Sequence, residues 1–458
     1  MRKKWVNFAA MALVSLCSPA APSRADNPIV QTKFTADPAP MVYKNTVYLY
    51  TGHDEDDAHG FLMRNWMCYT STDMVNWTDH GAVASLKDFK WLDTAAAGWG
   101  GSDNGAWAPQ CIERDGKFYM YCPVQGRGIG LLVADNPLGP FTEPLGKPLI
   151  GSQYDSIDPT VFIDKGQAYL YWGNPHLWYV KLNKDMISFS GTPIKCDATP
   201  EHYQEGPWFY KRGGHYYMAF ASTCCPEGIG YAMSDAPTGP WLFRGHIMQP
   251  DGRSSGNHPG IIDYKGSSYV FGFNYKLNYA LTSEHRERRS VCLEKLTYNP
   301  DGTINTVPWW DDAGVPQVGT LDPYIQNEAE TICYSEGIRS EPRGGRMDVY
   351  PEHAGAYIKV KGANFQANGA GTFTASVACD TTPGAAKDAV IELHLDRKDG
   401  PLIGTVPVSN TGGEWRSTTV AVNGVAGVHD LFFVFSGDAA GNAVKFDHWQ
   451  FSKKDAKR

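Results

Sequence analysis

The sequence lacks the features of several common protein classes. Its 41 lysine and arginine residues are dispersed among 49 acidic ones, which gives a net charge of −8 and leaves no basic stripe for nucleic acid. The cysteines and histidines form no CxxC or histidine-rich zinc spacing. The glycine-rich segment at residues 98–107 has no GK[ST] ending and does not indicate a phosphate-binding loop. These absences argue against a nucleic-acid partner, a structural zinc ion and a nucleotide site.

Long hydrophobic runs are also missing outside the N-terminus. The chain begins with MRKK, continues with an apolar run at residues 8–17 and reaches the small-x-small sequence Ser23-Arg24-Ala25. This order is typical of a secretory signal peptide, and the run is shorter than the roughly 20 residues that span a bilayer. We therefore expect residues 1–25 to be a signal peptide, the mature protein to be secreted (extracellular or periplasmic), and no segment to cross a membrane.

Nine of the ten cysteines remain once Cys17 is removed with the signal peptide. Export permits disulfides, but an odd number leaves at least one thiol free or bonded to another molecule. Cys224 and Cys225 are adjacent, whereas Cys333 and Cys379 both fall in the C-terminal part and are candidates to pair. The alternative, inert thiols buried in strands, best fits four others: Cys68, Cys111, Cys122 and Cys292.

What the chain does contain is a repeat. Five segments share a template in which a proline is followed by a turn residue seven positions later and by a tyrosine ten positions later. The prolines are Pro38, Pro109, Pro159, Pro207 and Pro259; the turn residues are Asn45, Gly116, Gly166, Gly214 and Gly266; the tyrosines are Tyr48, Tyr119, Tyr169, Tyr217 and Tyr269. Each copy predicts a hairpin, because glycine and asparagine tolerate the positive φ of a tight turn.

The period of the repeat indicates the fold. After a longer first interval the prolines recur roughly every 50 residues, a spacing that together with many short strands is typical of a β-propeller. We expect a five-bladed β-propeller over residues 26–322. The period then stops, and residues 325–458 show alternating strands with frequent turns, which predicts a β-sandwich (jelly-roll) module. The fold class is therefore all-β.

The residues just ahead of the repeated prolines should converge at one mouth of the propeller channel. They are Asp37, Ala108, Asp158, Gly206 and His258, with Glu205 one step before Gly206. Three carboxylates beside a histidine suit glycoside hydrolysis, in which one acid protonates the leaving oxygen and a carboxylate activates water. A third carboxylate would keep the acid protonated. The alternative is that the aspartates only cap turns. The run DEDDAHG at residues 54–60 hints at a calcium loop, but it lacks the acidic residue needed at position twelve, and a solvated acidic turn is expected instead.

Several segments resemble glycoside hydrolase family 43, the five-bladed propeller enzymes that act on arabinose- and xylose-containing glycans. They are FTADPAP, WAPQ, SIDPTVF, EGPWFYKRGGHYYMAF and NHPGIIDYKGSSYVFGFN, within residues 30–320. The resemblance implies that Asp37 is the general base, Glu205 the general acid and Asp158 the modulator of the acid's pKa. It also implies inversion at the anomeric carbon.

The same resemblance implies further contacts. His258 corresponds to the axial histidine of the family, which is associated with a central calcium ion or a water cluster. Arg289 is the best match to an arginine that reaches the substrate in the family, and Arg288 is the second candidate. Trp107 and Trp99 are candidates for a wall that stacks on a sugar ring, although Trp99 could equally be an ordinary loop residue.

The C-terminal part resembles a family 6 carbohydrate-binding module in QNEAETI, GAYIKVKGANF, GGEWRSTTVAV, GVHDLFFVFSG and KFDHWQF. The resemblance implies that Tyr350 and Trp415 sandwich a sugar ring. It also implies a structural calcium ion, with Glu328, Glu330 and Asp447 as ligands. Lys445 stands where the family often has a sugar-binding asparagine, so a sandwich without sugar affinity is an alternative.

We therefore expect a secreted, inverting hydrolase that removes α-L-arabinofuranosyl side chains from arabinoxylan or a related plant cell-wall polysaccharide, acting as a monomer. One alternative is a β-xylosidase or an endo-acting xylan or arabinan hydrolase with the same carboxylates. Pocket depth would separate these enzymes, since exo cleavage needs a closed pocket and internal cleavage an open groove. A non-catalytic sugar-binding protein is the alternative from another class.

Overall fold

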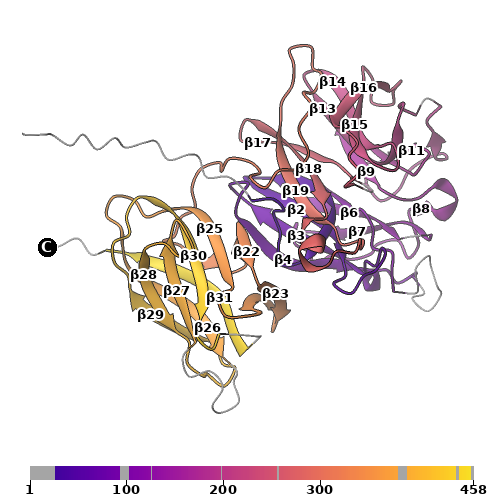
Figure 1. The fold of residues 1–458 in the computed structure, drawn as a ribbon. Coiled ribbons are helices and arrows are strands. Elements are labelled where there is room, and N and C mark those ends of the chain that lie inside the picture. Colours follow the sequence, from indigo (N-terminus) through magenta and orange to yellow (C-terminus); the bar gives the residue numbers. More distant parts are fainter. Residues whose placement is uncertain are drawn as a thin grey trace, which may run out of the picture.

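A computed structural model describes residues 26–92, 103–124, 126–197, 199–254, 257–379, 389–439 and 443–454 of the chain. The expected signal peptide at residues 1–25 and the candidate stacking residue Trp99 lie outside these ranges. Within them the chain folds into two all-β bodies, a ring of sheets and a sandwich (Figure 1).

Five antiparallel sheets, formed by consecutive stretches of chain, are the blades of the ring. The strands are β1 (Phe34–Tyr43), β2 (Thr46–Asp54), β3 (Asn65–Ser71) and β4 (Trp77–Ser85) in blade I; β5 (Gln110–Arg114), β6 (Lys117–Val124), β7 (Gly128–Ala134) and β8 (Ile150–Gly151) in blade II; β9 (Thr160–Asp164), β10 (Gln167–Trp172), β11 (Trp178–Leu182) and β12 (Ile194–Lys195) in blade III; β13 (Tyr203–Arg212), β14 (His215–Ser222), β15 (Gly228–Ser234) and β16 (Leu242–Met248) in blade IV; and β17 (Gly260–Tyr264), β18 (Ser267–Asn274) and β19 (Ser290–Leu296) in blade V. The predicted five-bladed propeller is confirmed.

The repeated template forms the inner hairpin of every blade. Its proline lies within or just before the innermost strand, and its tyrosine lies on the second strand. The turns follow the expected chemistry: in blade III both central residues, Lys165 and Gly166, have positive φ, at 49° and 85°. The short helix α1 (Lys276–Leu281) lies between β18 and β19, and no helix among the described residues is long and apolar enough to cross a membrane.

The first residues of the described chain close the ring against its last blade. The Asn27 side chain exchanges hydrogen bonds with the backbone of Leu293 on β19, and the Thr35 backbone N donates to the Arg289 carbonyl at 2.9 Å. Closure of this kind removes the free edge that blade V would otherwise expose. It also fixes β1 next to the segment that carries Arg289.

The C-terminal body is a sandwich of two sheets over a dense apolar core, as expected. One sheet contains β22 (Tyr334–Glu336), β25 (Tyr357–Asn364), β30 (Val428–Ser436), β27 (Val390–Leu395) and β28 (Leu402–Pro407); the other contains β23 (Ile338–Arg343), β24 (Arg346–Pro351), β31 (Val444–Lys453), β26 (Ala370–Cys379) and β29 (Arg416–Ala421), with β20 (Asn327–Glu328) paired to β31. Strand β21 (Thr331–Ile332) leaves the sandwich and pairs with β4 of blade I.

Hydrogen bonds also join the two bodies. The buried Asn76 side chain of blade I pairs with the backbone of Lys361 on β25, accepting at 2.8 Å and donating at 2.9 Å. Lys359 forms an ion pair with Asp26 at 2.8 Å. The sandwich is therefore attached to blade I by specific polar contacts as well as by the chain.

The cysteines correct one expectation. Cys333 and Cys379 are not bonded to each other, because they lie in different apolar clusters, one against the propeller and one inside the sandwich. The disulfide found in the described chain joins the adjacent Cys224 and Cys225. The four cysteines expected to be inert are buried free thiols.

Candidate active site

The residues ahead of the prolines meet at one end of the propeller axis. Asp37, Ala108, Asp158, Gly206 and His258 line a single open hollow there together with their prolines. Asp37 lies in an irregularity of β1 and Glu205 in one of β13, each at a point where the strand register shifts. Such irregularities re-aim side chains, and here they direct the carboxylates toward the axis.

Gly206 allows His258 to reach the axis. Its φ is 58°, and a Cβ at this position would lie 2.8 Å from Cγ of the imidazole. Asp37 and Asp158, at the matching positions of blades I and III, have similar φ values of 52° and 57° although they are not glycines. Backbone held in this region by non-glycine residues is unfavourable and is typical of functional sites.

His258 lies at the centre of the three carboxylates. Its Nδ1 is 3.6 Å from Oδ1 of Asp37, and its Nε2 is 3.3 Å from Oε1 of Glu205 and 3.8 Å from Oδ2 of Asp158. Since one imidazole ring bridges Asp37 and Glu205, these two carboxyls are at most roughly 9 Å apart, which does not exceed the upper end of the range of about 6.5–9.5 Å that inverting glycosidases use.

Arg289 holds the Asp37 side of the cluster. Its Nη1 donates to Oδ1 of Asp37 at 2.8 Å, and its Nη2 and Nε donate to the two oxygens of Asp54 at 2.9 and 3.0 Å. All three side chains are buried. The guanidinium, expected to reach substrate, thus orients a carboxylate, and Asp54, expected in a solvated turn, is fully buried at the end of β2. Arg288 instead donates to the Ala58 carbonyl, outside the cluster.

The charges of this cluster perturb one another strongly. Burial lowers the pKa of His258, but the carboxylates around it outweigh that effect and raise it to about 10, so the ring is an imidazolium. Burial raises the pKa of Asp158 to about 8, against the opposing charge of His258. Burial also raises the pKa of Asp37, with Arg289 opposing it.

Glu205 differs from the two aspartates. Burial raises its pKa, but the hydrogen bond and charge of His258, the charge of Arg289 and the hydrogen bond from Asn174 together bring the pKa below its usual value. The Asn174 side chain donates to Oε2 of Glu205 and accepts from Gln204 at 3.3 Å. Asn174 follows the end of β10, where the repeat template gives no signal, and sequence reasoning missed it.

The candidate stacking residue Trp107 lies beside the hollow, directly before Ala108. Its ring packs on Phe61 with centroids 5.2 Å apart, and its carbonyl accepts a hydrogen bond from the indole of Trp66 at 2.7 Å. Four tryptophans within or beside the blade strands are buried instead: Trp66, Trp77, Trp208 and Trp241.

Arginine side chains lie over the aromatic rings of the candidate sugar-binding residues in the sandwich. The Arg343 guanidinium lies 5.3 Å from the ring centre of Tyr350, and that of Arg346 lies 5.4 Å from the ring centre of Trp415. Lys445 lies on β31, paired with Ala378 of β26. The two aromatic faces are thus partly covered by cations, an arrangement that the sequence patterns did not predict.

Two groups of side chains could hold a metal ion. One is the Asp158, Glu205 and His258 cluster, and the other joins Glu328, Asp447 and His448 in the sandwich. Glu330 lies close enough for the charges of Glu328 and Asp447 to act on it, although burial is the main reason that its pKa is raised to about 9.

Comparison with known proteins agrees with this geometry. Residues 25–304 match the glycosyl hydrolases family 43, and residues 328–453 match the carbohydrate binding module family 6. The chain is 34% identical to an arabinoxylan arabinofuranohydrolase of Bacillus subtilis (strain 168), over 93% of this chain and 92% of that protein.

Solved structures give the same picture. A family 43 arabinoxylan arabinofuranohydrolase from Bacillus subtilis, crystallised with cellotetraose, has a TM-score of 0.81 and 31% identity, covering 94% of this chain and 99% of its own. A β-xylosidase/α-arabinofuranosidase from a compost metagenome, in complex with xylotriose and in a calcium-free form, has a TM-score of 0.54 and 27% identity, covering 63% of this chain and 99% of its own.

A propeller with three carboxylates around its axis defines the protein as a glycoside hydrolase. The chain belongs to glycosyl hydrolase family 43 and carries a C-terminal family 6 carbohydrate-binding module. The resemblance seen in the sequence motifs is thereby confirmed.

Proposed function

We propose that this enzyme releases α-L-arabinofuranosyl side chains from arabinoxylan with inversion at the anomeric carbon. The observation that carries the proposal is the cluster itself, in which His258 bridges Asp37 and Glu205 from opposite ring nitrogens at 3.6 and 3.3 Å. The choice of glycan is supported by similarity over nearly the whole chain, both domains included, to a protein named for that activity.

Asp37 is the general base in this proposal. A base must be ionised, and the Arg289 guanidinium at 2.8 Å favours the carboxylate form against the burial that opposes it. Arg289 is itself oriented by Asp54, so the pair fixes the direction in which Asp37 takes a proton from water. The water then attacks the anomeric carbon from the side opposite the leaving oxygen.

Glu205 is the general acid and must carry a proton when the glycosidic bond breaks. Before substrate binds, the raised pKa of Asp158 and the lowered pKa of Glu205 place that proton on Asp158. A glycan seated on Glu205 removes the remaining water from its carboxyl and raises its pKa. The proton then passes to Glu205, and Asp158 is left ionised beside His258 and the Gly206 N–H, which donates to it at 3.1 Å.

The test is the product released from defined glycans by the wild-type enzyme and by Glu205→Gln. We expect the wild type to release arabinose from arabinoxylan, and the variant to lose turnover by about 10²–10⁴-fold while still binding arabinoxylo-oligosaccharides. Xylose as the main product would identify a β-xylosidase instead. Shortened chains without free arabinose would identify an endo-acting enzyme, and sugar binding without turnover in the wild type a lectin.

The sandwich is proposed to bind the polysaccharide and to hold a structural calcium ion. Glu328, Glu330 and Asp447 supply the carboxylate oxygens that calcium prefers, and Oε2 of Glu330 is buried without a hydrogen-bond partner. An ion there would offset the mutual repulsion of these carboxylates. If so, calcium raises the melting temperature of the wild type but not of Glu328→Gln, and equal behaviour of the two proteins argues against the site. A second calcium near His258 is less compatible with the imidazolium form of that ring.

Export and assembly are also proposals. The charged start, apolar run and small-x-small sequence support cleavage after residue 25 and secretion. A disulfide between Cys224 and Cys225 suits an oxidising compartment. N-terminal sequencing of exported protein would test the cleavage site, and a sedimentation mass of one chain would support the proposed monomer.

A further inference from the structure

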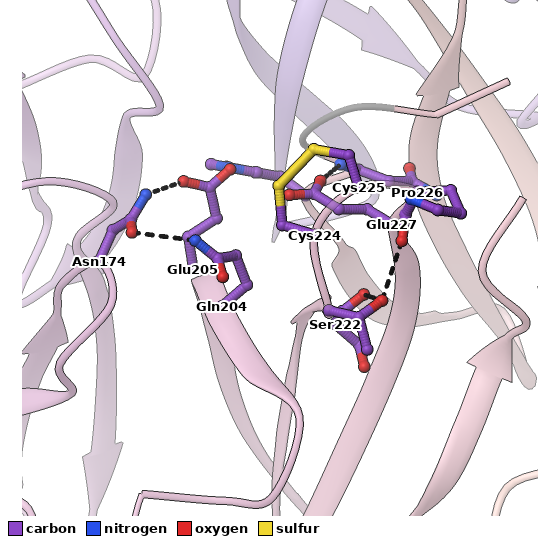
Figure 2. The surroundings of a disulfide bond; sticks show 11 residues. Asn174, Gln204, Glu205, Ser222, Cys224, Cys225, Pro226 and Glu227 are labelled. Atoms are coloured by element: carbon purple, nitrogen blue, oxygen red, sulfur yellow. Dashed lines mark hydrogen bonds and ion pairs between the residues drawn. A yellow bond between two sulfur atoms is a disulfide. The ribbon is translucent and has the colours of Figure 1, made fainter. Parts of the chain in front are cut away.

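An exposed disulfide stands beside the general acid. Cys224 and Cys225, on the loop between β14 and β15 of blade IV, are bonded to each other and exposed, as is Pro226. Glu205 pairs with Ala221 in the register of β13 and β14, so the loop begins at the same end of the blade as the acid. Figure 2 shows the two sulfur atoms in the surroundings of Gln204 and Glu205.

The loop is held in place from both sides. The Thr223 backbone N donates to the His202 carbonyl at 3.0 Å, and the Thr223 hydroxyl donates to the Pro226 carbonyl at 2.9 Å. After the disulfide, the buried Glu227 accepts a hydrogen bond from the backbone N of Asn257 at 2.8 Å. These contacts tie the loop to His202, directly before the strand that carries Glu205, and to the segment that ends in His258, so they hold the loop in place.

The position of the disulfide determines which part of a bound glycan it can contact. The other side of the cluster is closed by the buried Arg289 and Asp37, and a general acid protonates the oxygen of the leaving group. The part of the glycan that extends past Glu205 is therefore the leaving group, which is the xylan chain once arabinose is in the hollow. Two sulfur atoms and a proline ring form an apolar, polarisable surface that suits the C–H face of a pyranose ring.

We propose that the Cys224–Cys225 disulfide and Pro226 form the wall of the leaving-group subsite, packing against the xylose unit that carries the arabinose. This inference rests on the function proposed above. It adds a contact that a xylan chain makes as leaving group and that a small leaving group is too short to make. The acid, the base and the histidine act as before, and the disulfide takes no part in bond breaking.

The test compares two substrates with the double variant Cys224→Ser/Cys225→Ser. For an arabinoxylo-oligosaccharide we expect kcat/KM to fall about tenfold, mainly through KM, because the xylose unit loses its apolar contact. For methyl α-L-arabinofuranoside, whose methyl group is too small to reach the loop, we expect no change in kcat/KM or in its pH profile. An equal fall for both substrates, or a shifted pH profile, would mean that the disulfide acts by positioning Glu205 and His258, and would overturn the proposal.

Reduction of the wild type gives the same comparison if the double variant does not fold. Within the described ranges the Cys224–Cys225 bond is the one disulfide, so tris(2-carboxyethyl)phosphine acts there on this bond. We expect the reductant to weaken the oligosaccharide reaction of the wild type and to leave its reaction with methyl α-L-arabinofuranoside unchanged. Oligosaccharide kinetics that are the same before and after reduction would refute the proposal. A wild type that releases no arabinose from either substrate would instead refute the proposed function.

Discussion

In the proposed cycle Asp158 neither takes a proton from the attacking water nor protonates the leaving oxygen. It nevertheless sets the pH range in which the enzyme works. The cluster holds its mobile proton below pH 8 and loses it as the pH rises through the pKa of about 8 that Asp158 shows. The basic limb of kcat/KM is therefore expected near pH 8 in the wild type. Its position depends on how strongly the neighbouring charges retain a proton on the Asp158–Glu205 pair.

Replacement of Asp158 by asparagine tests this role. Asp158→Asn removes a negative charge beside Glu205, so the pKa of Glu205 falls and the basic limb moves to lower pH. The pH dependence of kcat/KM on arabinoxylo-oligosaccharide is the measurement. Asp164→Asn, at the opposite end of β9, is a matched control that keeps the wild-type limb. A limb that stays in place in Asp158→Asn would remove this residue from the proton path.

At the same scale, the sequence located four residues of the cluster but not the residues that hydrogen-bond and orient them. Asp37, Asp158, Glu205 and His258 could be found because the proline template marks the same strand position in every blade. Asp54 and Asn174 could not, since they come from the ends of second strands, where the template carries no pattern. Which residues contact each other also depends on how blades pack, and period alone does not encode this.

At the scale of elements, the innermost strands owe their function to the residue before each proline. A Cβ at Gly206 would lie 2.8 Å from the His258 ring, whereas a Cβ at Gly166, in the hairpin turn of blade III, would meet nothing within 4 Å. Both glycines have positive φ. The two positions therefore separate the cost of the backbone conformation from the cost of displacing the histidine.

Alanine at these two positions gives a matched pair. Gly166→Ala is expected to reduce the free energy of unfolding by about 1 kcal/mol and to leave kcat unchanged, because only the backbone is disfavoured. Gly206→Ala carries the same backbone cost and in addition moves His258, so kcat should fall at least about tenfold. Thermal unfolding and steady-state kinetics measure the two effects. Equal kcat values would show that His258 does not need its close approach to β13.

The hairpins themselves were predictable and the irregularities within them were not. Turns with glycine or asparagine and alternating apolar residues predicted the five inner hairpins, and the structure confirms them. The register shifts that aim Asp37 and Glu205 at the axis depend on contacts between strands, such as Gly206 against His258, that are distant in sequence. Sequence reasoning therefore placed these carboxylates near the mouth without their orientation.

At the scale of the whole molecule, the propeller and the sandwich share a sheet and a buried polar contact. Strand β21 extends blade I, and Asn76 lies in the junction, where its amide satisfies both the N–H and the carbonyl of Lys361. The sequence predicted two domains but not their attachment, because Asn76 and Lys361 are ordinary residues in their own strands. A buried backbone amide that loses its partner destabilises a protein by about 1–3 kcal/mol.

Asn76→Ala is therefore expected to loosen the two bodies from each other. The variant removes the side-chain oxygen that accepts from the Lys361 N–H and should reduce the free energy of unfolding by about 2–3 kcal/mol, which separates the unfolding of the sandwich from that of the propeller. Calorimetry should show one transition for the wild type and two for Asn76→Ala. Asn299→Ala, in an exposed turn, changes stability by less than about 0.5 kcal/mol and serves as the control. Two transitions already present in the wild type, at temperatures that Asn76→Ala does not change, would show that the junction contributes nothing to cooperativity.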